Sequence, residues 1–197
     1  MGADLGRRSF LSGGAAALAL ASLGGCATMA RSRRLRLTLA GQALMKHPLC
    51  ADPYPGFDQV VAELARGEVA FTNLEVAIRT PRSGAPTREG GFMHAAEPAV
   101  LDCVKRMGFD LLSLANNHAW DLGTQGVLAT REAVAARGFA HAGTGPDLAS
   151  ASAAGFVAGA PRVGLVAMAV GKIREGGAAT DTRAGVNELR FAGGALD

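Results

Sequence analysis

The chain is poor in aromatic and in charged residues. Its 197 residues include one tryptophan and one tyrosine, charged residues make up 19%, and the formal net charge is only +3. Proteins that bind nucleic acid typically carry a basic stripe interleaved with aromatic side chains, so this composition argues against a nucleic-acid partner. Hydrophobic residues make up 49%, which is typical of a globular domain and not of a disordered chain.

The apolar run near the N-terminus is too short for a membrane-spanning helix. It consists of small apolar residues from Gly13 to Leu23, whereas a span needs about 20 residues. The run follows the twin-arginine pattern Arg7-Arg8-Ser9-Phe10-Leu11. Together these features predict a twin-arginine-type export signal over residues 1–26, with an ordinary Sec signal as the alternative. In either case we expect an exported protein of the periplasm or cell envelope.

Cys26 ends the stretch Leu23-Gly24-Gly25-Cys26, which resembles a bacterial lipobox. Lipidation of Cys26 would anchor the mature protein to a membrane, and plain cleavage nearby is the alternative. The linker that follows, residues 27–34, is rich in arginine. It is expected either to lie against anionic lipid head groups or to remain solvated.

The chain has three cysteines, and two remain besides Cys26: Cys50 and Cys103. An oxidising compartment would permit a disulfide between them. Because the sequence does not show that they are close, two unpaired thiols are the default expectation. Their spacing does not suggest a metal site.

Strand and helix patterns alternate along residues 35–170. Strands are predicted over residues 35–40, 69–73, 110–115, 139–142 and 162–170, and the helices between them begin near Asp58, Pro98 and Thr124 and end at Gly67, Gly108 and Gly138. This order predicts an α/β fold with a mostly parallel sheet. The three glycines are expected to take left-handed conformations at the helix ends. Residues 171–197 are rich in glycine and are expected to be a tail or the entry to a truncated continuation.

Polar residues follow three of the predicted strands. The first strand runs into Gly41-Gln42, the second into Asn73-Leu74-Glu75, and the third into Asn116-Asn117-His118. In a parallel sheet these ends lie at one edge, where open α/β folds keep their ligand sites. Oxygen ligands with an imidazole suit divalent Mn, Mg, Fe or Zn. Such a metal could hold an oxyanion substrate and activate water, and His118 could protonate a leaving oxygen.

Each of these residues also has a simpler interpretation. A single asparagine is most often a turn residue, Glu75 alone is most often a solvated carboxylate, and Asp121 is most simply a turn residue or near-cap of the helix beginning at Thr124. The remaining histidines are isolated and are expected to be structural or solvent-facing; they are His47, His94 and His141. The cluster as a whole nevertheless favours a functional site.

Four blocks of the chain resemble the bacterial capsule-synthesis CapA (poly-γ-glutamate synthesis, PGA_cap) family. They are Leu35–Leu44, Phe71–Glu75, Ser113–Gly126 and Gly138–Gly145, with a weaker similarity at Gly185-Val186-Asn187. The block Ser-Leu-Ala-Asn-Asn-His-x-x-Asp-x-Gly is the most specific. The resemblance implies a metallophosphatase-like α/β/β/α sandwich, related to the calcineurin-like phosphoesterases, of which residues 35–170 hold the N-terminal part only.

The resemblance also implies a site for two divalent metals. In it Glu75 looks like a metal-bridging residue, Asn117 like an amide ligand and His118 like the catalytic acid. Four residues would shape the site: Gln42, Asn73, Asn116 and Asp121. The family acts in making, exporting or releasing extracellular polyglutamate or capsule, so the expected partner is an extracellular polymer or a small-molecule oxyanion substrate.

Two departures from the family pattern bear on activity. The family's first block usually reads Gly-Asp, but here it is Gly41-Gln42, which removes a negative charge and is expected to weaken metal binding. The later His-Trp-Gly and Gly-His-x-His blocks do not occur in these 197 residues. The alternatives to an active metal-dependent hydrolase are therefore a non-catalytic envelope binding or scaffold protein, or an inactive fragment of a longer enzyme.

Overall fold

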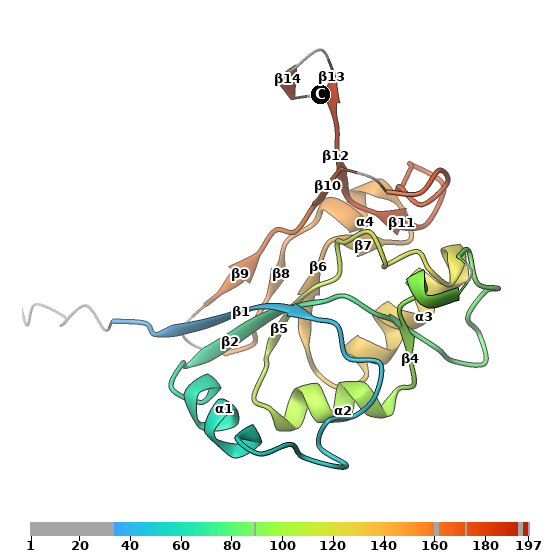
Figure 1. Ribbon diagram of the computed structural model, residues 1–197. Helices are drawn as coiled ribbons and strands as arrows, with labels where there is room; N and C mark the ends of the chain where they lie inside the picture. Colours follow the sequence, from blue (N-terminus) through green and yellow to red (C-terminus); the bar gives the residue numbers. More distant parts are fainter. Residues whose placement is uncertain (1–33, 89, 160–161, 172, 193–194, 197) are drawn as a thin grey trace, which may run out of the picture. The chain divides into compact units, whose positions relative to one another are not determined.

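The computed structural model describes residues 34–88, 90–159, 162–171, 173–192 and 195–196 (Figure 1). The predicted export signal, Cys26 and most of the predicted linker lie outside the described residues. The helices and strands of the described residues belong to the unit Leu35–Asp197. Among the described residues, no helix has the length and apolar character needed to cross a membrane.

The largest sheet has four parallel strands, as the sequence pattern predicts. They are β1 (Leu37–Ala43), β2 (Val69–Leu74), β5 (Leu111–Ser113) and β6 (Ala140–Ala142), and they lie side by side in the order β1-β2-β5-β6. Helix α1 (Phe57–Leu64) connects β1 to β2, α2 (Ala99–Arg106) precedes β5, and α3 (Gly123–Ala135) connects β5 to β6. The predicted α/β class with a parallel sheet is therefore confirmed.

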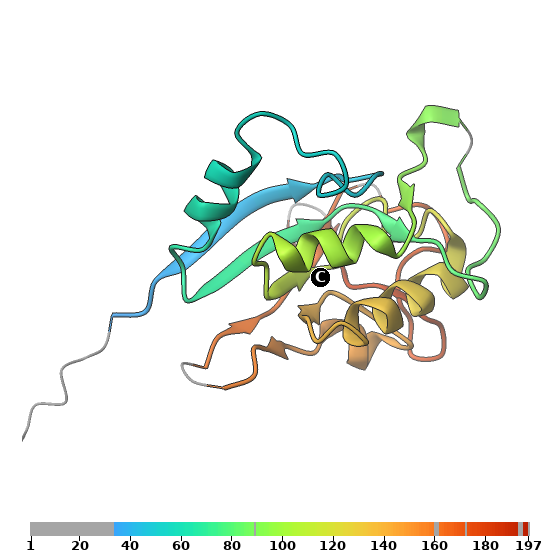
Figure 2. The same ribbon diagram turned by 90° about the horizontal axis from the view of Figure 1, so that it is seen from below.

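The two faces of this sheet have different surroundings. On one face, Ala70, Leu74 and Leu112 pack with apolar residues of α1, α2 and α3 in the main core, and α2 lies across the strands in the view of Figure 2. On the other face, Val69 and Leu111 pack against Val163. Leu39, which pairs with Phe71 in the register of β1 and β2, is 70% exposed, so the described residues leave the β1 side of this face open.

The helices begin within one residue of the predicted positions Asp58, Pro98 and Thr124, but neither Asp58 nor Thr124 caps its helix. Helix α1 begins at Phe57 behind Gly56, so Asp58 lies in the first turn and is not its cap. Helix α3 begins at Gly123 and has no side-chain cap, because the apolar Leu122 occupies the cap position. Thr124 lies in the first turn, where its hydroxyl accepts a hydrogen bond from the indole Nε1 of Trp120 at 3.2 Å. Pro98 directly precedes α2, where its fixed φ suits a helix start.

The three helix-ending glycines are required for two different reasons, a left-handed backbone conformation and a close approach between chain segments. Gly108 and Gly138 have φ values of 93° and 70°, which confirms the predicted left-handed conformation. The prediction is wrong for Gly67, whose φ is not in the left-handed range. A Cβ at Gly67 would lie 2.5 Å from Oγ1 of Thr38, so this glycine allows the close approach of the chain to β1.

The apolar stretch at residues 162–170 is not one continuous strand, contrary to the prediction. It forms β9 (Gly164–Leu165), which pairs with β8 (Gly155–Phe156), and β10 (Ala169–Val170), which pairs with β12 (Glu188–Leu189). The stretch is interrupted because its two ends pair with different parts of the chain. The side chains still alternate, with Ala167 and Ala169 buried and Met168 and Val170 exposed.

Short strands connect the residues after 170 with the rest of the unit. β11 (Gly185–Val186) pairs with β7 (Thr144–Gly145), which is followed by α4 (Leu148–Ser152). Val186 is fully buried. The sequence predicted a tail or the entry to a continuation after residue 170, whereas residues 185–189 are part of the fold. The other pairs are β3 (Ala77–Ile78) with β4 (Ala95–Ala96) and β13 (Phe191–Ala192) with β14 (Ala195–Leu196).

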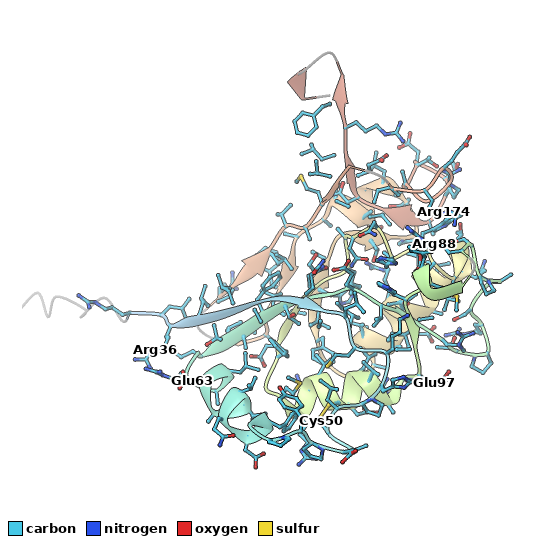
Figure 3. The ribbon with its side chains drawn as sticks, in the orientation of Figure 1. Arg36, Cys50, Glu63, Arg88, Glu97 and Arg174 are labelled. Carbon is cyan, nitrogen blue, oxygen red and sulfur yellow. A yellow bond between two sulfur atoms is a disulfide. The ribbon has the colours of Figure 1, made fainter. Side chains whose placement is uncertain are left out.

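A disulfide joins Cys50 to Cys103, with a Cα–Cα distance of 5.5 Å (Figure 3). The default expectation of two unpaired thiols is therefore wrong. Cys103 lies on the buried side of α2, and Cys50 lies in the connection between β1 and α1. The fold brings these two segments together, although 53 positions separate the cysteines in the sequence.

Candidate functional site

Asp121 occupies the centre of a buried polar cluster just after β5. Its side chain is fully buried, and its Oδ2 lies 2.8 Å from Nδ1 of His118 and accepts a hydrogen bond from the backbone N–H of His94 at 2.7 Å. The predicted role of Asp121 as a turn residue or helix near-cap is therefore incomplete, because its carboxylate points into the cluster and binds the imidazole. A carboxylate at Nδ1 fixes the orientation of the ring and the nitrogen that carries the proton.

Arg88 contacts the other oxygen of the same carboxylate. Its Nε lies 2.6 Å from Oδ1 of Asp121, in the geometry of an ion pair and not of an aligned hydrogen bond. Its Nη2 donates a hydrogen bond to the backbone oxygen of Asn117 at 2.5 Å. Arg88 comes from the connection between β3 and β4 and is labelled in Figure 3. Sequence reasoning did not identify this residue.

His94 also belongs to this cluster, which corrects the expectation that it is an isolated histidine. Its ring stacks on the ring of His118, with 3.7 Å between the centroids and 21° between the planes. Burial lowers the pKa of His94 below its ordinary value of 6.5, and positive charge at His118 and Lys46 lowers it further. The neutral form of His94 is therefore favoured, because burial and nearby cations both disfavour a charged imidazole.

A chain of amide hydrogen bonds joins the ends of β2 and β5. Asn116 donates through Nδ2 to Oδ1 of Asn73 at 3.1 Å and to the backbone oxygen of Leu74 at 2.9 Å. Asn73 in turn donates to Oε2 of Glu75 at 3.3 Å. The Oδ1 of Asn116 accepts from the backbone N–H of His118 at 3.0 Å. The structure thus brings together most of the residues that the sequence predicted at this edge.

The remaining two predicted residues lie at the margin of the cluster. Gln42 pairs with Asn73 in the register of β1 and β2, so the two residues are neighbours on adjacent strands. Both Gln42 and Asn117 are exposed. The contact that Asn117 makes in this cluster is through its backbone oxygen, to Arg88.

The described residues do not fit a two-metal centre. No group of three or more His, Cys, Asp or Glu residues in that part of the chain is arranged to hold a metal ion. The physical reasons are local. The position beside Asn73 carries the neutral amide of Gln42, and the carboxylate of Asp121 is already bound to Arg88, His94 and His118. Glu75 is left as the carboxylate at the end of β2.

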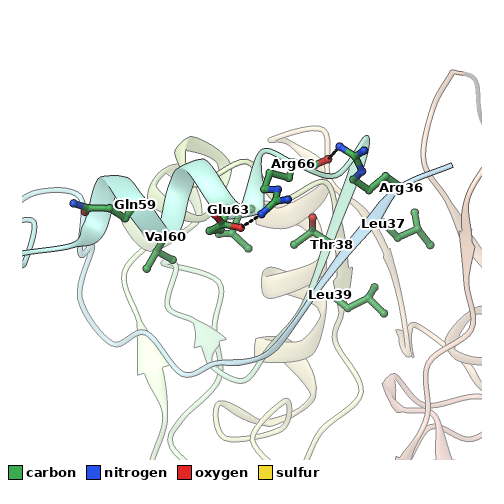
Figure 4. Close-up of a pocket in the computed structure, with 9 residues that line it drawn as sticks. Arg36, Leu37, Thr38, Leu39, Gln59, Val60, Glu63 and Arg66 are labelled. Atoms are coloured by element: carbon green, nitrogen blue, oxygen red, sulfur yellow. Dashed lines mark hydrogen bonds and ion pairs between the residues drawn. The ribbon is translucent and has the colours of Figure 1, made fainter. Parts of the chain in front are cut away.

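A separate open groove of about 610 Å³ lies between β1 and α1 (Figure 4). Its walls include Leu37, Leu39 and Val60, and the 2.8 Å ion pair between Glu63 and Arg66 lies on its α1 side. None of the predicted site residues lines this groove. The candidate site is therefore the polar cluster around Asp121 and His118.

Comparison with known proteins places these features in a family context. The family described as bacterial capsule synthesis protein PGA_cap matches residues 31–192. The uncharacterized proteins y4sH and y4uA of Sinorhizobium fredii (strain NBRC 101917 / NGR234) are each 33% identical to this chain over 164 residues. These residues cover 79% of this chain and 36% of each relative, so the chain spans about a third of the length of these relatives.

Proposed function

Because the chain belongs to the PGA_cap family of bacterial capsule synthesis proteins, we propose that its polar cluster binds an oxyanion group of an extracellular polymer or of a small-molecule substrate. His118 then donates a proton to a leaving oxygen of that group. The family is metallophosphatase-like and supports a role related to capsule synthesis. The observation that carries the proposal is the 2.8 Å contact between Nδ1 of His118 and the fully buried carboxylate of Asp121.

The geometry of this pair determines which nitrogen can act on a substrate. An ionised carboxylate oxygen can only accept a hydrogen bond, so Nδ1 of His118 is the donor, and its proton stays on Nδ1 in the hydrogen bond to Asp121. The nitrogen available to a ligand is then Nε2. In a hydrolytic step, His118 protonated on both ring nitrogens would transfer the Nε2 proton to the leaving oxygen as its bond breaks. Water would supply the hydroxyl group, and the proton that the water gives up would return to Nε2.

Positive charge near the cluster supports an anionic ligand. Arg88 is paired with Asp121, whereas the charge of Lys46 acts on the ring of His94. Basic and imidazole groups are suited to hold carboxylate or phosphate oxygens. Divalent Mn, Fe, Zn or Mg are the cofactors that the family implies. Because the described residues do not form a ligand group for them, no step of the proposal passes through a metal.

We further propose that the protein is exported, and anchored to a membrane if Cys26 is lipidated. The twin-arginine pattern before Cys26 supports export. The disulfide between Cys50 and Cys103 supports it independently, since disulfides form and persist in oxidising compartments. Mass spectrometry of the mature N-terminus tests the anchor: a diacylglycerol-modified Cys26 is the expected result, and an unmodified N-terminus contradicts it.

A second candidate function is a non-catalytic envelope binding or scaffold protein. The observation that favours it is the amide of Gln42 beside Asn73 together with the lack of a three-residue ligand group among the described residues. Such a protein would bind the same oxyanion group without breaking a bond. Elemental analysis of the purified protein is informative here, because stoichiometric metal would favour the hydrolase.

The experiment combines binding with turnover. Inorganic phosphate and a γ-glutamate oligomer are titrated into the protein while the histidine NMR signals are followed, and phenyl phosphate serves as the hydrolysis probe. His118→Gln is compared with the control His47→Gln, which changes an exposed histidine outside the cluster. Loss of a general acid lowers turnover by roughly 10² to 10⁴-fold.

The outcomes separate the candidates. Binding and turnover in the wild type and in His47→Gln, with turnover lost in His118→Gln, is the expected result. Binding of either probe ligand without turnover favours the envelope binding protein. If neither phosphate nor the oligomer shifts the signal of His118, the cluster is not an oxyanion site and the proposal is wrong.

A further inference from the structure

The connection between β3 and β4 wraps over the turn that carries His118. It runs from residue 79 to residue 94, with residue 89 outside the described part, and it contributes both Arg88 and His94. We infer that Arg88 and His94 are positioning residues for His118, which they hold in the orientation needed for proton transfer. The inference deepens the proposed function and rests on it in one respect: the orientation of His118 affects catalysis only if His118 transfers a proton to a substrate.

The connection first fixes the backbone of the turn. The N–H of Thr87 donates to the backbone oxygen of Asp121 at 2.8 Å, and the hydroxyl of Thr87 donates to the backbone oxygen of Trp120, also at 2.8 Å. Arg88 adds the bond to the backbone oxygen of Asn117. Three carbonyl groups of the turn around His118 are therefore held by two consecutive residues of one distant segment.

The same connection also fixes the side chain of Asp121. Arg88 pairs with Oδ1, and the backbone N–H of His94 bonds to Oδ2, the atom that His118 also contacts. With both oxygens engaged, rotation of the carboxylate would break contacts to Arg88 and His94 as well as to His118. The position of the start of β4 consequently sets the position of the imidazole of His118.

The ring of His94 provides a second constraint on His118. It covers one face of that imidazole at a centroid distance of 3.7 Å, so the ring of His118 is held at its edge by Asp121 and at its face by His94. The Nδ1 of His94 is buried and has no hydrogen-bond partner among the described residues. Its contribution to the cluster is thus the flat ring face, which a phenylalanine could also supply.

Contacts away from the cluster anchor the connection independently. β3 and β4 pair at Ala77–Ala95, and the N–H of Ile78 donates to the hydroxyl of Thr130 on α3 at 2.8 Å. Arg82, on the same connection, pairs with Glu132 of α3. Replacing Arg82 therefore removes an arginine of the connection without touching Asp121, which makes Arg82→Met a matched control for Arg88→Met.

The test reads the orientation of His118 directly, in the ligand-free protein. Long-range ¹H–¹⁵N NMR spectra report which ring nitrogen carries the proton and whether the Nδ1 proton is protected from exchange. The wild type and Arg82→Met are expected to show one Nδ1–H tautomer with a protected proton. His94→Ala and Arg88→Met are expected to show mixed tautomers and rapid exchange, and His94→Phe is expected to restore the single tautomer.

Two results would overturn the inference. One is a wild-type spectrum of His118 in folded His94→Ala and Arg88→Met, with folding checked by circular dichroism. The other is loss of the single tautomer in Arg82→Met to the same extent as in Arg88→Met, which would indicate general destabilisation. If Arg88→Met does not fold, the comparison of His94→Ala with His94→Phe still tests the inference, because only the phenylalanine is expected to restore the single tautomer.

Turnover of phenyl phosphate then separates this inference from the proposed function. If both hold, His94→Ala lowers kcat by about tenfold to a hundredfold with little change in KM, since misplacement of a reacting group by about 1 Å costs rate more than binding. His94→Phe recovers most of this loss. If the wild type binds no phosphate while its NMR spectra behave as expected, the proposed function fails and the positioning of His118 stands.

Discussion

Reduction of the disulfide between Cys50 and Cys103 is expected to lower the free energy of unfolding by about 4 kcal/mol. The bond closes a loop between positions 53 residues apart. The loss of chain entropy in the unfolded state is worth about 3 kcal/mol for a 15-residue loop and about 4.7 kcal/mol for a 100-residue loop, which brackets this one. For a domain of this size the loss corresponds to a decrease in Tm of about 10 °C.

The assay is urea unfolding followed by tryptophan fluorescence, with and without a phosphine reductant. Trp120, the single tryptophan of the chain, is held by its bond to Thr124 at the start of α3 and reports on the region of the site. Reduction is preferable to substitution as the main perturbation because Cys103 is buried, and replacing it would add a packing cost. The Cys50→Ser/Cys103→Ser double variant is the control, and its curves should not respond to the reductant.

Two results would refute the reasoning. If thiol titration of the unfolded, unreduced protein finds Cys50 and Cys103 free, the bond does not form. If the bond is shown to be broken by the reductant and the unfolding curves still coincide, then closing this loop does not stabilise the native state. A shift in the wild type with no shift in the double variant supports the calculation.

Three other perturbations test the fold. Leu112→Ala, at a fully buried position of the central strand β5, should cost about 2 to 5 kcal/mol in urea unfolding; a cost below that of an exposed-site control such as Leu39→Ala would mean that the core is misplaced. Gly143→Ala should be destabilising in thermal unfolding, because its φ is 103° and a Cβ there would lie 2.5 Å from that of Ala115; an unchanged Tm would contradict this backbone. Burial lowers the pKa of His141 from 6.5, so the unfolded chain binds the proton more readily, and the free energy of unfolding should fall as pH decreases below about 6.5; His141→Gln should flatten this dependence, and an equal slope in both proteins would refute it.

The sequence pattern was informative at several places where structure is set locally, although not at Gly67. The apolar runs of β2 and β5 and the glycines at 108 and 138 each predicted the observed element, because a strand or a helix end depends on neighbouring residues. The run at 162–170 is different. Its composition predicts an extended chain, but its division into β9 and β10 depends on where β8 and β12 lie, which no local pattern contains.

The residues of the candidate site likewise fall into those that the local sequence predicted and those that it did not. Asn73, Glu75, Asn116 and His118 were predicted because each follows a strand, and parallel strands bring their carboxyl ends to one edge. His94 and Arg88 were missed because they lie in a glycine-rich connection with no periodic pattern, and nothing in their local sequence indicates the turn that they contact. Asp121 was noticed, but its partners could be named only after the fold was known.

By itself, the sequence determined the α/β class, the family and the strand ends that carry polar side chains. Only the tertiary structure decided that Cys50 bonds Cys103 and that Arg88 and His94 enclose the pair of Asp121 and His118. The physical reason is the separation along the chain of the residues that interact. Strand and helix patterns arise from interactions over a few residues, whereas a disulfide, an ion pair or a stacked ring requires two distant segments to meet within a few ångströms.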